Sequence, residues 1–143
     1  MKTMVFNVVR VVRVEPGAEL GGTVFDQWLH IEFGGSTASV FDPDMIAPEY
    51  ASGELHEVKL SLMATSVEPS TSRASGVSGN RYYGRVVFVV ERQDFFDHLL
   101  DINGLRVHLV EQTNYPLFEY LAVQGRLDLI DIKLPEPTGW DTV

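Results

Sequence analysis

The chain has 143 residues, which is enough for one domain with a hydrophobic core. Its formal charge of −9 opposes non-specific binding to nucleic acid, because cationic side chains have to neutralise the phosphates. The absence of cysteine excludes disulfides and thiolate chemistry and is compatible with the cytoplasm, where we expect the protein to act. No apolar stretch approaches the ~20 residues of a membrane span. Arg10 and Arg13 interrupt the N-terminal apolar run, which is unlike a signal peptide.

The charges are segregated along the chain. Residues 15–58 contain no Lys or Arg, and their acids are Glu15, Glu19, Asp26, Glu32, Asp42, Asp44, Glu49, Glu54 and Glu57. Residues 73–92 contain only one acid, Glu91, and the arginines Arg73, Arg81, Arg85 and Arg92. Such segregation either serves solubility or forms a face that attracts a basic partner.

The first half of the chain predicts β-strands. Residues 4–15 are rich in valine, and one bulge in this strand would bring Arg10 and Arg13 to the same face. Residues 28–33 and 36–41 alternate around Gly34-Gly35, which predicts a two-residue hairpin. The register then gives one largely apolar face and a second face of Trp28 opposite Phe41, His30 opposite Ser39, and Glu32 opposite Thr37.

The connection that follows, residues 42–53, contains two prolines and is expected to hold at most one helical turn. Residues 54–68 predict a strand with Val58, Leu60 and Leu62 on one face. Residues 69–80 are rich in Ser and Gly, so we expect a flexible linker.

The second half predicts the same plan. Residues 81–91 form a strand in which the unbroken apolar run 86–90, centred on Phe88, predicts burial on both faces. Asn103-Gly104 predicts a second hairpin between residues 97–102 and 105–110. A helix over residues 94–103 is the competing interpretation. Residues 126–134 predict a closing strand with a bulge, since its apolar alternation changes parity there.

These elements predict an all-β protein. We expect an antiparallel barrel or sandwich, OB-like in its order of elements, forming a single domain over residues 1–143. The two halves, 1–68 and 81–135, would be duplicated strand–hairpin–strand units joined by the flexible segment 69–80, with a tail at 136–143. The alternative is that any antiparallel β protein produces this pattern without duplication.

No catalytic motif is present, so we expect neither an enzyme nor a cofactor. His30 and Glu32 share a strand face and resemble part of a metal site, but a third ligand would have to come from Asp42 or Asp44. Solvated strand faces often carry such pairs, and we predict no metal.

Three functional interpretations remain. The first is a non-enzymatic acidic module that binds another protein with a basic surface, in the manner of inhibitor or immunity proteins, and homo-oligomerisation stays open. Its predicted contact residues are Trp28, His30, Glu32, Phe41, Asp42 and Asp44. A structural alternative is that a second layer, such as the tail with Trp140, covers Trp28 and Phe41.

The second interpretation is an OB-like protein that binds single-stranded nucleic acid, although the net charge disfavours it. It rests on cations interleaved with aromatic residues: Arg73, Arg81, Tyr82, Tyr83 and Arg85. The third is a carrier or enzyme that holds a small ligand in a barrel cavity.

Overall fold

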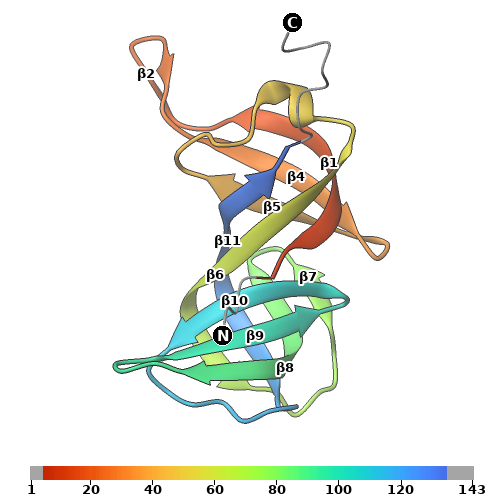
Figure 1. Ribbon diagram of the computed structural model, residues 1–143, viewed down its shortest axis with the longest axis vertical. Helices are drawn as coiled ribbons and strands as arrows, with labels where there is room; N and C mark the ends of the chain where they lie inside the picture. The colour runs from red at the N-terminus through yellow and green to blue at the C-terminus, as the bar shows by residue number, and fades with distance from the viewer. Residues whose placement is uncertain (1–4, 135–143) are drawn as a thin grey trace, which may run out of the picture.

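A computed structural model of the chain describes residues 5–134. Within this range the protein is built from β-strands and a single short 3₁₀ turn (Figure 1). The elements are β1 (Asn7–Pro16), β2 (Glu19–Leu20), β3 (Thr23–Val24), β4 (Gln27–Phe33), β5 (Ser36–Asp42), η1 (Glu49–Ala51), β6 (Leu55–Pro69), β7 (Gly76–Ser78), β8 (Arg81–Glu91), β9 (Phe96–Ile102), β10 (Leu105–Glu111) and β11 (Tyr120–Lys133). The predicted all-β class is confirmed.

The strands close into two rings that share their longest members, β6 and β11. In the first barrel the hydrogen-bonded order is β1, β4, β5, β11, β6 and back to β1. In the second barrel it is β8, β9, β10, β6, β11 and back to β8. Figure 1 shows the two barrels stacked end to end, with β6 and β11 running from one into the other.

The pairing of β6 with β11 has pseudo-twofold symmetry about its centre. Leu62 pairs with Leu127 at that centre, and the pair Val58–Ile132 on one side corresponds to Val67–Val123 on the other. Each strand has one unpaired bulge residue, Thr65 in β6 and Ile130 in β11, at equivalent places. The predicted bulge in the closing strand is therefore real, and it has a counterpart in the other half.

The remaining strands follow the same repeat. A bulge in β1 follows Val11 in its pairing with β4, and a bulge in β8 follows Val86 in its pairing with β9. Arg10 faces Glu32 in the first barrel, just as Arg85 faces Asp101 in the second. The repeated strand–hairpin–strand architecture expected from the sequence is thus present in the strand pairings.

Both predicted hairpins are confirmed with their registers. Around Gly34-Gly35 the pairs include Trp28–Phe41, His30–Ser39 and Glu32–Thr37. Around Asn103-Gly104 they include Ile102–Leu105 and Asp101–Arg106, and the last two side chains form an ion pair at 3.5 Å. The helix considered over residues 94–103 is wrong, because this segment contains β9.

The interiors of both barrels are packed with side chains, as is usual for rings of few strands. Among the most deeply buried are Leu29, Ile31 and Leu60 in the first barrel and Leu100, Leu109 and Leu121 in the second. Within the described residues no helix is long and apolar enough to cross a membrane.

The prediction that residues 86–90 are covered on both faces is wrong. Val86 is fully buried, whereas Phe88 keeps 38% of its surface exposed. The bulge after Val86 changes which residues of β8 point inward, so the alternation of buried and exposed residues along this strand is broken. An apolar run in a barrel strand therefore does not require burial on both sides.

The segment at 69–80 is more ordered than a simple linker. Strand β6 continues to Pro69, and β7 pairs with β8 from Gly76–Tyr83 to Ser78–Arg81. In addition, the hydroxyl of Ser75 accepts a hydrogen bond from the backbone N–H of Asn103 at 2.6 Å. The closing strand is also longer than expected, since β11 begins at Tyr120. The predicted docking of Trp140 lies outside the described residues.

Candidate interaction surface

The outer face of the β4–β5 hairpin carries the predicted aromatic pair. The rings of Trp28 and Phe41 pack at a tilt with their centroids 5.0 Å apart. The guanidinium of Arg126 lies over the Phe41 ring at 4.4 Å, and both aromatic side chains are half-buried. Arg126 itself is held by Asp128 through two hydrogen bonds of 2.6 and 3.0 Å. These bonds raise the pKa of Arg126, so the guanidinium stays protonated. Phe41 is thus packed between the Trp28 ring and the guanidinium of Arg126 and is not freely exposed.

His30 on the same face also forms hydrogen bonds within the protein. Its Nε2 donates to Glu15 Oε2 at 2.6 Å, and the Ser39 hydroxyl lies 3.1 Å from its Nδ1. This hydrogen bond, together with the nearby charge of Arg13, lowers the pKa of the Glu15 carboxyl. Glu32 remains exposed. Within residues 5–134 no three potential ligands come together to hold a metal ion.

Asp42 belongs to the framework and not to the surface. It is completely buried, and its carboxylate accepts hydrogen bonds from Gln27 Nε2 at 2.8 Å, Ile46 N at 3.0 Å and Ala47 N at 2.9 Å. Its expected role in partner contact therefore does not hold, because a partner cannot reach this side chain. Asp44, two residues later, is exposed.

The turn that follows Asp42 is part of an exposed surface at the end of the first barrel that lies away from the second barrel. The β2–β3 hairpin and the connection between β5 and β6 lie at this end in Figure 1. Gln27 ties the connection to β4, because its amide donates to the Asp42 carboxylate and to the Ala47 carbonyl at 2.7 Å. We call this surface the acidic end. Its exposed apolar side chains are Leu20, Phe25, Met45, Ile46 and Tyr50, and its exposed carboxylates are Glu19, Asp44, Glu49 and Glu54.

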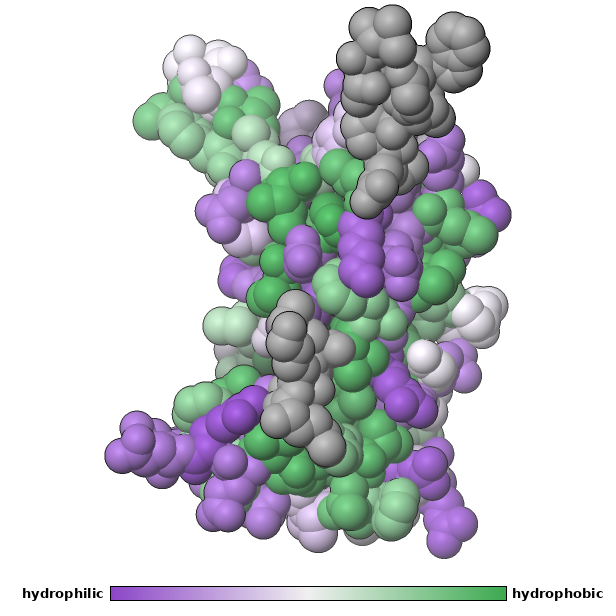
Figure 2. Space-filling view, viewed as in Figure 1, coloured by the Kyte–Doolittle hydropathy of each residue, from purple (hydrophilic) through white to green (hydrophobic). Residues whose placement is uncertain are grey.

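Apolar exposure at the acidic end is high. Leu20 is 74% and Tyr50 is 72% exposed. Figure 2 shows apolar side chains on the projecting β2–β3 hairpin, at the upper left. Residues 14–58 contain no Lys or Arg. Arg10 approaches the edge of this surface, where its guanidinium donates to the Gly53 carbonyl at 3.0 Å. Sequence reasoning recognised the acids but missed the apolar residues, since two-residue strands give no periodicity from which exposure could be inferred.

The residues predicted to bind nucleic acid do not all lie on one surface in the structure. Tyr82 points into the second barrel, where burial raises the pKa of its phenol. Arg81, Tyr83 and Arg85 alternate with it and share the outer face of β8. Arg85 lies over the Phe118 ring at 5.4 Å, and Arg73 is exposed in the loop before β7.

No protein-family model matches the sequence, and no curated protein matches it at a significant level. The function is therefore inferred from the geometry and charge of the surfaces described above.

Proposed function

We propose that the protein is a non-enzymatic binding module that holds a basic partner protein at the acidic end. The observation that carries this proposal is the group of exposed apolar side chains, such as Leu20 and Tyr50, among carboxylates with no Lys or Arg in their segment. Exposed apolar patches with polar rims are typical of protein contact sites. Carboxylates around such a patch favour encounter with a basic surface and penalise acidic competitors.

The framework beneath the acidic end supports the same proposal. Asp42 and Gln27 tie the connection to the barrel through buried hydrogen bonds. Gly17 N donates to the Asp26 carbonyl at 2.9 Å, and Ala18 N donates to its carboxylate at 2.6 Å, which anchors the β2–β3 hairpin. A surface held in place before contact loses little conformational entropy on binding. By this proposal the module acts in the cytoplasm by occupying its partner, as inhibitor or immunity proteins do.

The test is capture from a lysate of the native cell with the immobilised protein and two variants. The first variant, Leu20→Ser with Tyr50→Ser, removes two apolar contacts from the acidic end. The control, Ile130→Ser, changes an exposed apolar side chain at the β11 bulge. We expect a basic protein that binds the wild type and the control but not the first variant. With the purified partner, affinity should fall as salt rises from ~50 to ~300 mM, because the charges are exposed.

Two results of this test would contradict the proposal. One is a partner whose binding is unchanged in the double variant, which would place the contact elsewhere. The other is a captured protein that is acidic and whose affinity does not respond to salt. Since Leu20 and Tyr50 are largely exposed, the double variant is expected to lose no more than ~0.5 kcal/mol of stability, and urea melts of both variants check that they stay folded.

A second candidate function is binding of single-stranded nucleic acid by the second barrel. Its support is the row of Arg81, Tyr83 and Arg85 on one strand face, which alternates cations with an aromatic ring. The strand order of this barrel, β8, β9, β10, β6, β11, with β10 parallel to β6, also matches the order of an OB-type barrel. A fluorescence titration with single-stranded oligonucleotides decides this case, since true binding must weaken steeply with salt. The net charge of −9 makes it the weaker candidate.

A further inference from the structure

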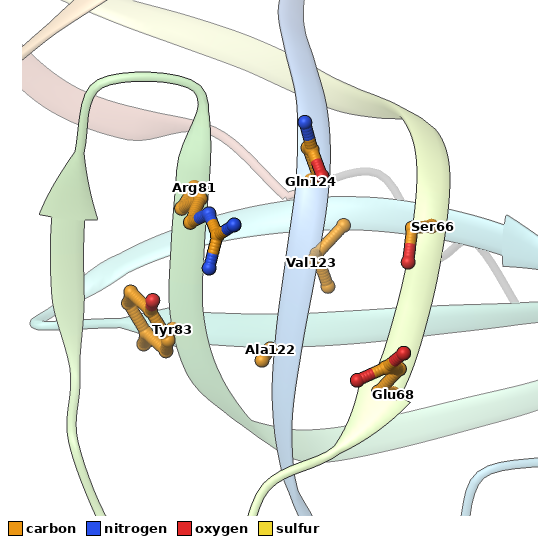
Figure 3. A pocket seen from close by; sticks show the side chains of 7 residues that line it. All are labelled: Ser66, Glu68, Arg81, Tyr83, Ala122, Val123 and Gln124. Carbon is orange, nitrogen blue, oxygen red and sulfur yellow. The ribbon is translucent and has the colours of Figure 1, made fainter.

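A small hollow of about 130 Å³ lies on the outer face of the second barrel, where β6, β11 and β8 run side by side (Figure 3). Its lining residues are Ser66 and Glu68 from β6, Arg81 and Tyr83 from β8, and Ala122, Val123 and Gln124 from β11. The strand register places Ala122 between Tyr83 and Glu68. The methyl group of Ala122 is too short to fill the space between these longer neighbours, which leaves the hollow.

The repeated architecture provides an internal comparison for this hollow. In the first barrel, Glu57 occupies the position of Ala122, because it pairs with Val8 and Lys133 as Ala122 pairs with Tyr83 and Glu68. A long side chain therefore stands where the second barrel has a methyl group. Lys133 is opposite Glu57 in the strand register, and its ammonium group lies over the Phe6 ring, 4.4 Å from the ring centroid.

The two charged side chains that line the hollow have no ion-pair partner among the described residues. These are Glu68 and Arg81, which lie on opposite sides of β11. Figure 3 shows the carboxylate of Glu68 and the guanidinium of Arg81 both turned toward β11 from their two sides. A ligand lying over Ala122 would thus meet an anion at one end and a cation at the other.

We infer that this hollow binds a small zwitterion, of the class of α-amino acids with short side chains. Arg81 matches a carboxylate, because its planar guanidinium donates two parallel hydrogen bonds. Glu68 accepts from an ammonium group, and the Tyr83 ring covers an aliphatic side chain. The volume of about 130 Å³ is well below the ~300–1,000 Å³ of sites for larger ligands, which argues against a nucleotide. This site goes beyond the proposed protein contact and lies on the other barrel.

The test is a ¹H–¹⁵N NMR titration of the whole protein with L-alanine. The site is open to water, so we expect binding in the ~mM range. Amide signals of residues 66–68, 81–83 and 122–124 should shift and saturate. Acetate and methylammonium each carry only one of the two charges, and each should bind at least about tenfold more weakly than alanine.

Three variants sharpen the titration. Glu68→Gln should weaken alanine binding about tenfold, because the ammonium group loses its counter-charge. Glu57→Gln removes the carboxylate at the Ala122 position of the first barrel and is the matched control, which should bind alanine like the wild type. Ala122→Gln places a side chain of the size of Glu57 in the hollow and should abolish binding.

Several results would overturn the inference. Among these are no saturation with alanine, an equal response to acetate, or unchanged affinity in Glu68→Gln. Tighter binding of adenosine monophosphate at the same amide signals would identify a nucleotide site instead. Should Ala122→Gln not fold, the pair Glu68→Gln and Glu57→Gln still decides the question. Failure here leaves the capture experiment at the acidic end unaffected, because no residue is shared.

Discussion

Leu127→Ala should destabilise both barrels together. Leu127 is fully buried in β11, pairs with Leu62 at the centre of the repeat, and also pairs with Val40 of the first barrel. The substitution deletes one methine and two methyl groups, equivalent to about three CH₂ units, so the lost transfer free energy is ~2–3 kcal/mol at ~0.8 kcal/mol per unit, and the remaining cavity adds to it. We therefore expect a loss of ~3–5 kcal/mol, a large share of the ~5–15 kcal/mol typical of a domain.

The assay is urea unfolding followed by one probe in each barrel. Trp28 fluorescence, in a Trp140→Phe background, reports on the first barrel, and the imidazole NMR signal of buried His98 reports on the second. Because β6 and β11 belong to both rings, the two probes should give the same midpoint in the parent protein and the same lowered midpoint in the variant. Separate midpoints, or a loss below ~1 kcal/mol, would refute the idea that the shared strands join the barrels into one cooperative unit.

Three further substitutions test individual side chains. Phe88→Ala should cost less than ~2 kcal/mol in urea melts, because this side chain is 38% exposed; a loss of ~3–5 kcal/mol would mean that it is core. Asp42→Ala should cost ~2–4 kcal/mol by leaving several buried donors unpaired, whereas Asp44→Ala should stay within ~0.5 kcal/mol; equal effects would contradict the assigned framework role. His30→Ala should raise the pKa of Glu15 toward its ordinary value of 4.5, as measured by a carboxyl NMR titration. Since the folded-state pKa of Glu15 is lowered, its stabilising contribution is present above pH 4.5 and is lost as pH falls through the folded value; an unchanged Glu15 titration would contradict this.

Local chemistry was sufficient to predict the hairpins. Gly34-Gly35 and Asn103-Gly104 provide the positive φ angles that two-residue turns need, and alternation on either side sets the register. Ring closure could not be predicted in this way. Pairings such as Val40 with Leu127 join residues far apart in the chain, and no local pattern encodes them.

The errors have definite physical causes. The burial of Phe88 was misjudged because the one-residue bulge after Val86 has no marker in a run of valines. Asp42 was expected at the surface because the burial of an acid depends on donors such as Gln27, which only the folded chain brings near. Arg126 lies over Phe41 because β5 pairs with β11. This contact joins residues far apart in the chain, so it could not be predicted from the local sequence around Phe41.

Amide hydrogen exchange, measured with and without the captured basic partner, tests most directly whether the acidic end is the contact surface. Binding should slow exchange in residues 18–26 and 43–54, and this protection should disappear in the Leu20→Ser, Tyr50→Ser variant. Protection confined to β8 and β9, with the acidic end unchanged, would contradict the account.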